Sequence, residues 1–189
     1  MKNLKFLAFF FTAALLLVSC SNDDDNSEPI NEEEVITTLT ASLTTPDGPT
    51  ILLTYRDLDG DGPNPPLITV SGNLLPNATY TGSLILLNET ESPVEDITEE
   101  IAEEDDEHQF FFQVGAGLNI SNVTYLDFDG NGNPLGLNFS FQTGDASQGN
   151  FTITLRHDLD KNAAGVSEGN IANAGGETDI AVTFPMVIQ

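Results

Sequence analysis

Two short loops of this chain carry oxygen-bearing side chains at alternate positions, a spacing that suits a bound cation. Residues 54–62 and 124–132 both read T-Y-x-D-x-D-G-[DN]-G, and each follows a predicted strand. Calcium takes six to eight oxygen ligands, and a glycine in such a loop allows the sharp turn that wraps them around one ion. Both loops therefore predict calcium binding. The candidate ligands are Asp57, Asp59 and Asp61 in the first loop and Asp127, Asp129 and Asn131 in the second.

The D-x-D-x-[DN]-G core of both loops resembles the first half of the calcium loops of EF-hands and dockerins. In those families a bidentate glutamate follows at position twelve, where this chain has Ile68 and Asn138. The resemblance therefore implies weak binding, or further ligands from elsewhere. Because Asp-Gly and Asn-Gly also favour tight hairpin turns without a metal, a plain turn is the alternative interpretation of each loop.

The two histidines of the chain form a second candidate site. His157 continues the apolar alternation of residues 151–155, and His108 shares the parity of the aromatic residues in 110–112. If these two strands were neighbours, the imidazoles and nearby carboxylates could bind zinc or copper. A buried, hydrogen-bonded histidine, or one at a sheet edge, is the alternative interpretation. Because the sequence contains no nucleophile elbow, P-loop or HExxH motif, we expect a protein that is not an enzyme.

Alternation of apolar and polar residues predicts an all-β fold. An antiparallel β-sandwich, Ig-like or jelly-roll-like, would bury one face of each strand and leave the threonine-rich face in water. One short amphipathic helix is predicted near 93–104, with Ser92 as its N-cap, Pro93 in its first turn and Glu95 completing a capping box. The predicted strands, about nine in number, are 38–44, 51–55, 67–70, 79–87, 109–113, 120–126, 137–141, 151–155 and 180–188.

The N-terminus has the pattern of an export signal that ends in a lipidation site. Lys2 and Lys5 precede the apolar stretch 6–18, and Leu17–Cys20 resembles the bacterial lipoprotein box. The resemblance implies that residues 1–19 are removed and that lipid on Cys20 holds the protein to a bilayer. The segment 20–25, Cys-Ser-Asn-Asp-Asp-Asp, resembles the surface-export signal of Bacteroidota lipoproteins. It favours an outer-membrane protein displayed on the cell surface over one that faces the periplasm.

The chain after this signal is strongly acidic. Residues 20–34 are predicted to be a disordered acidic tether, and residues 35–189 to be a single domain. Removing Lys2 and Lys5 leaves three basic residues against 30 acidic ones, a formal charge of −27. Such a charge excludes nucleic acid as a partner and attracts divalent cations or basic proteins. The five consecutive acids of 103–107 fit either a solvated edge or a patch for such a partner.

Three blocks, 89–100, 108–112 and 173–180, resemble a small family of acidic flavobacterial lipoproteins of unassigned activity. Some members carry the label "type 1 periplasmic binding", which implies a two-lobed, doubly wound fold that this strand-rich chain does not match.

Two hypotheses of function follow from the sequence. The first is a membrane-anchored, non-enzymatic binding or interaction module, stabilised by calcium, for a protein or ligand that the sequence does not identify. The alternative is a transition-metal-binding lipoprotein that uses His108 and His157 to serve an outer-membrane transporter. A third and weaker hypothesis is a protein that acts on glycans.

Overall fold

A computed structural model describes residues 34–60 and 62–189. They belong to a compact unit that extends from Glu33 to Gln189. Within this described part, no helix has the length and apolar character needed to cross a membrane. Cys20 and Asp61, both named as candidate residues, lie outside the described residues.

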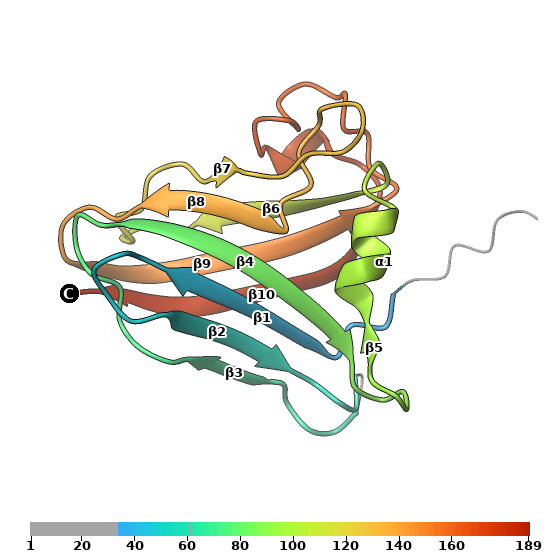
Figure 1. Ribbon diagram of the computed structural model, residues 1–189, viewed down its shortest axis with the longest axis horizontal. Coiled ribbons are helices and arrows are strands. Elements are labelled where there is room, and N and C mark those ends of the chain that lie inside the picture. The colour runs from blue at the N-terminus through green and yellow to red at the C-terminus, as the bar shows by residue number, and fades with distance from the viewer. Residues whose placement is uncertain (1–33, 61) are drawn as a thin grey trace, which may run out of the picture. The chain divides into compact units, whose positions relative to one another are not determined.

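Two antiparallel sheets pack face to face, as the alternation predicted (Figure 1). The first sheet has the order β3-β2-β1-β4-β8-β7, with β5 paired to β4, and the second has the order β10-β9-β6. The strands of the first sheet are β1 (Thr38–Thr44), β2 (Ile51–Arg56), β3 (Leu67–Val70), β4 (Thr79–Asn88), β5 (Glu95–Asp96), β7 (Thr124–Tyr125) and β8 (Asn138–Gln142). Those of the second sheet are β6 (His108–Val114), β9 (Ser147–His157) and β10 (Glu177–Ile188).

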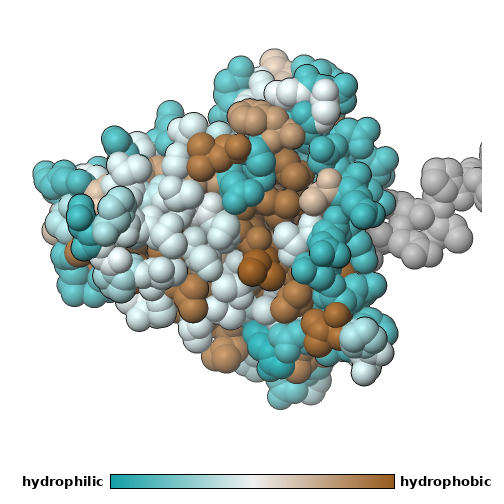
Figure 2. Space-filling view, viewed as in Figure 1, coloured by the Kyte–Doolittle hydropathy of each residue, from teal (hydrophilic) through white to brown (hydrophobic). Residues whose placement is uncertain are grey.

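The core lies between the two sheets and is built from the alternate residues that the sequence pattern identified. In β1 the side chains of Leu39, Ala41 and Leu43 are fully buried, and Phe151 and Ile153 of β9 are buried likewise. Figure 2 shows the opposite face of the first sheet, which is mostly pale because threonine and serine dominate it, with isolated hydrophobic side chains. The prediction of an all-β sandwich-like fold is confirmed.

The helix is shorter than predicted. Helix α1 runs from Ile97 to Glu103, and its N-cap is Asp96, whose carboxylate accepts a hydrogen bond from the amide of Thr98 at 3.0 Å. Residues 93–96 do not join the helix, because Glu95 and Asp96 pair with the end of β4 as strand β5. The helix covers one end of the two sheets (Figure 1). The 3₁₀-helix η1 (Ile171–Asn173) lies in the long connection between β9 and β10.

Candidate metal centre

The two histidines lie side by side at the end of the second sheet. Strands β6 and β9 are paired, and His108 is directly opposite His157. Their rings are nearly parallel, with centroids 4.4 Å apart and an interplanar angle of 20°. Both residues are buried, as their parity with the apolar residues predicted. The condition for a histidine site, that the two strands be neighbours, is therefore met.

A β-bulge in the neighbouring strand brings a carboxylate to these rings. Thr178 pairs with Arg156 and Ile180 pairs with Leu155, so Asp179 is the extra residue of β10. Its side chain is 1% exposed, and its oxygens lie 3.9 Å from Nε2 of His108 and 4.0 Å from Nδ1 of His157. Bulges are common beside functional sites because they redirect a side chain. Sequence reasoning missed Asp179, since alternation alone cannot locate a bulge.

A second carboxylate comes from the chain just before β1. One oxygen of Glu34 lies 2.8 Å from Nε2 of His108, and the other lies 3.7 Å from Nδ1 of His157. The following segment is fixed to β4, because the amide of Thr37 donates to the carbonyl of Leu87 at 3.0 Å. Composition assigned Glu34 to the acidic segment 20–34, ahead of the first predicted strand. No feature of the acidic run 32–34 distinguishes this glutamate from its neighbours.

Glu34, His108, His157 and Asp179, here named the histidine–carboxylate cluster, have the composition and spacing of a metal centre. One ligand atom from each residue can be chosen so that all four lie within 4.8 Å of one another. Zinc bonds of about 2.0–2.1 Å in a tetrahedron place ligand atoms roughly 3.3 Å apart. The contacts of 2.8 to 4.0 Å between histidine nitrogens and carboxylate oxygens bracket that separation. Small side-chain movements would therefore close the cluster around one ion.

Groups outside the cluster lie against the outer nitrogen of each ring. Nδ1 of His108 lies 3.2 Å from the carbonyl oxygen of Glu104, and its Nε2 faces the cluster. Nε2 of His157 lies 3.5 Å from a carboxylate oxygen of Glu107, which leaves Nδ1 facing inward. A carbonyl or carboxylate partner for the distal nitrogen is typical of metal-binding histidines.

Several inward-facing atoms of the cluster lack a hydrogen-bond partner. These buried atoms are Nε2 of His108, Nδ1 of His157 and Oε2 of Glu34. Nε2 of His108 nevertheless lies 2.8 Å from the other carboxylate oxygen of Glu34, a contact that affects the pKa of both groups. Leaving buried polar atoms unsatisfied is unfavourable by about 1–3 kcal/mol each. A cation bound between them would satisfy all of them at once.

The contacts within the cluster shift the pKa values of His108 and Glu34 in opposite directions. Burial alone would lower the pKa of His108, but contact with Glu34, with the Glu104 carbonyl and with Asp179 raises it above its ordinary value. Burial alone would raise the pKa of Glu34, but His108 and His157 more than offset this and lower it. The carboxylate of Glu34 is thus held in its charged form, which is the form that binds metal.

The basic residues of the described part are all engaged elsewhere. Arg56 pairs with Glu89 at 2.8 Å. The guanidinium of Arg156 donates to the carbonyl of Gly175 and so holds the turn before β10. Lys161 contacts Asp129 at 3.2 Å. Of the residues described, only the two histidines are therefore available to balance the carboxylates of the cluster.

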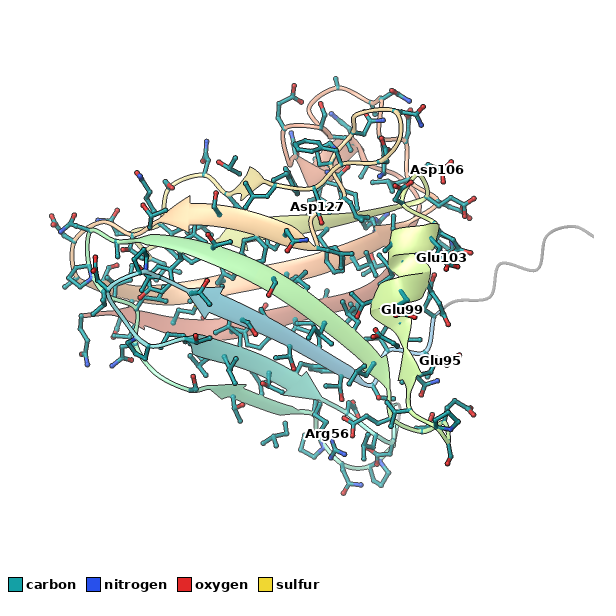
Figure 3. The ribbon with its side chains drawn as sticks, viewed as in Figure 1. Arg56, Glu95, Glu99, Glu103, Asp106 and Asp127 are labelled. Carbon is teal, nitrogen blue, oxygen red and sulfur yellow. The ribbon has the colours of Figure 1, made fainter. Side chains whose placement is uncertain are left out.

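The carboxylates of the second acidic loop, residues 124–132, accept hydrogen bonds from the backbone. The carboxylate of Asp127, labelled in Figure 3, accepts hydrogen bonds from the amides of Gly136 at 2.8 Å and Asn138 at 2.9 Å. That of Asp129 accepts from the amides of Asn131 at 2.9 Å and Asn133 at 2.8 Å. The side chains of this loop are thus directed to its own backbone, as in a tight turn.

A lysine completes this second loop. Nζ of Lys161 lies 3.2 Å from Asp129, 3.1 Å from the carbonyl of Pro134, and also contacts the carbonyl of Asp105. Only 4% of Lys161 is exposed. Burial lowers the pKa of Lys161. Burial alone would raise the pKa of Asp129, but hydrogen bonds from the loop amides and from Lys161 more than offset this and hold it below its usual value. The ammonium group of Lys161 thus lies against Asp129, one of the three candidate calcium ligands of this loop.

The first acidic loop also turns its carboxylates toward nearby amides. Asp57 accepts a hydrogen bond from the amide of Gly60 at 3.1 Å, and Asp59 accepts one from the side chain of Asn64 at 2.7 Å. Its third candidate, Asp61, lies outside the described residues. Within the described part of the chain, neither loop brings three acid or histidine ligands together. Calcium binding there stays a prediction.

No known protein family, curated protein or solved structure matches this chain.

Proposed function

We propose that this protein binds a divalent transition-metal ion, preferentially zinc, in the histidine–carboxylate cluster. The observation that carries the proposal is the convergence of two buried imidazole nitrogens and two buried carboxylates from four separate segments of the chain. Of the two hypotheses drawn from the sequence, this geometry supports the transition-metal alternative.

The ligand set favours a transition metal over calcium or magnesium. Calcium and magnesium bind oxygen ligands almost exclusively, whereas imidazole nitrogen suits zinc, copper, nickel and iron. Two nitrogens and two carboxylate oxygens form a four-coordinate set that zinc accepts without preference for a planar geometry. The side chains of the cluster are at most 7% exposed. Four ligands and little access for water are typical of zinc sites that bind rather than catalyse.

The proposed setting comes from the sequence. The Leu17–Cys20 motif and the acidic segment after it support a lipid-anchored protein of the outer membrane. There it would act as a metal-binding protein that supplies an outer-membrane transporter. The negative charge of the chain would concentrate cations around it.

Zinc titration of the metal-free protein tests this proposal. We would use residues 20–189, which contain the whole compact unit, with Cys20→Ser to exclude the thiol as a ligand. Zinc at a hundred times its Kd adds about 2.7 kcal/mol to the free energy of unfolding. For a domain of this size, the thermal midpoint should rise by roughly 5–10 °C.

Variants locate the effect. Glu34→Gln and His108→Asn should each reduce the zinc-dependent shift, and each variant's own unfolding transition in the absence of zinc shows that it folds. Glu99→Gln, at an exposed position of α1 labelled in Figure 3, is the matched control and should keep the full shift. If zinc at 100 μM stabilises none of these proteins, or stabilises the Glu34 and His108 variants as much as the control, the proposal is wrong. Calcium at about 1 mM, added to the same samples, tests the two acidic loops.

A further inference from the structure

Two further carboxylates lie on the outer side of His157. Glu104 and Glu107, here named the outer carboxylates, stand in the turn between α1 and β6. Together with His157 they offer three ligand atoms within 4.8 Å of one another. Both outer carboxylates are exposed, whereas the cluster is buried.

One imidazole therefore faces both groups. Nδ1 of His157 points into the cluster and has no hydrogen-bond partner, and the residue is only 5% exposed. Nε2 points the other way, with Glu107 at 3.5 Å and Asp158 at 3.9 Å. A neutral imidazole has one lone pair, so it can hold a metal on only one side at a time.

The charge around this turn favours the arrival of cations. The run 103–107 is entirely acidic, and the last turn of α1 contains no basic residue. Figure 3 shows Glu99 and Glu103 along α1, with Glu95 in β5 just before the helix and Asp106 beyond its end. The same edge is strongly hydrophilic in Figure 2. A surface that carries one sign of charge raises the local concentration of oppositely charged ions and speeds their association.

We propose that the outer carboxylates and Nε2 of His157 form a second, solvent-facing cation site, through which a divalent metal ion reaches the histidine–carboxylate cluster. This inference rests on the proposed function of the cluster. An ion held by Nδ1 would leave the ring with no lone pair at Nε2. The outer site then loses its nitrogen ligand, so that filling the inner site weakens the outer one.

The rates of zinc association and dissociation test this inference. A residue on the entry route and a residue that only orients His157 change these rates in different ways. A group on the route lowers the barrier in both directions, so its loss slows association and dissociation equally and leaves Kd unchanged. A group that only orients His157 would instead change dissociation and Kd. Glu104→Gln is the variant of choice, since its side chain belongs to the outer site and takes part in none of the ion pairs described above.

We would measure stopped-flow zinc association and chelator-driven dissociation with residues 20–189 carrying Cys20→Ser. Glu104→Gln should slow both rates by roughly tenfold and change Kd by less than about threefold. Glu103→Gln removes the same charge one residue away and should leave both rates near those of the parent protein. Unchanged rates in Glu104→Gln, equal slowing in both variants, or a change confined to Kd would each overturn the outer site while leaving the cluster in place. Absence of zinc binding in the parent protein would overturn the cluster itself.

Discussion

Two regions of this protein bury carboxylates, and they balance the negative charge in different ways. At Asp129 the chain supplies its own cation, because the ammonium group of Lys161 lies 3.2 Å from the carboxylate and also contacts backbone carbonyls. In the histidine–carboxylate cluster, none of the described lysine or arginine side chains reaches the carboxylates, and ring nitrogens face them instead. A carboxylate that a lysine of the chain neutralises serves the fold, whereas carboxylates that face imidazole nitrogens suit the metal binding proposed above.

This contrast also explains why acidic loops are a weak indicator of metal binding. Carboxylates at alternate positions satisfy backbone amides in a tight turn as readily as they coordinate an ion. Histidines on a buried face have fewer ways to be satisfied. The cluster stands out because one nitrogen of each ring faces two buried carboxylates.

The largest expected effect is a loss of stability at the pair of Lys161 and Asp129. Lys161→Met should leave the buried carboxylate of Asp129 without its counter-charge, and breaking a buried pair in this way lowers stability by about 3–5 kcal/mol. Urea unfolding at neutral pH measures the loss. The double variant Lys161→Met/Asp129→Asn should regain a large part of it. A single variant as stable as the parent would mean that the pair contributes little.

The second largest effect is expected from deletion of Asp179, the extra residue of the β-bulge. Deleting Asp179 would make Thr178 and Ile180 consecutive, opposite the consecutive Arg156 and Leu155, so that the ladder of β9 and β10 becomes regular. We expect the metal-free protein to lose less than about 1 kcal/mol of stability. Zinc affinity should fall at least tenfold, because losing a ligand costs no less than losing a group that orients one. Unfolding and zinc competition assays on one sample measure both. Equal losses in the two assays would show that the bulge serves the fold.

A smaller effect is expected at the edge of the compact unit. A chain that begins at Val35, the domain boundary that composition indicates, retains every strand but lacks Glu34. Its zinc affinity should fall by about tenfold, with little change in metal-free unfolding. Residues 34–189 are the matched comparison. If the two chains bind zinc equally, Glu34 is not a ligand.

The smallest effect concerns an acid–cation pair at the surface. Arg56 and Thr38 hold the pKa of Glu89 at about 2, below its ordinary 4.5. A lowered carboxylate pKa adds stability above pH 4.5 that is lost as the pH falls toward 2. Because the pair is exposed to solvent, Glu89→Gln should lower the thermal midpoint by under about 2 °C at pH 7. The difference from the parent should shrink between pH 4.5 and 2; a constant difference would contradict the assignment.

Sequence periodicity predicted the sandwich-like fold but only two of the four residues of the histidine–carboxylate cluster. Alternation located all three strands of the second sheet and the inward direction of both histidines, because side chains of a strand alternate strictly. It could not locate Asp179, which owes its position to a bulge, or Glu34, which precedes the first strand. The start of α1 was also wrong, since pairing of Glu95 and Asp96 with β4 replaces the predicted first turn.

The position of Glu34 also has a mechanical consequence. The compact unit begins at Glu33, so tension applied to the chain from its N-terminal side reaches this side chain before it reaches β1. A bound ion would therefore resist the first peeling of the chain away from β4, and such peeling would remove one ligand from the ion. We expect force applied at residue 20 to weaken zinc binding, and zinc to raise the force at which the first segment detaches. Single-molecule pulling in zinc and in chelator would measure both halves of this reciprocal relation.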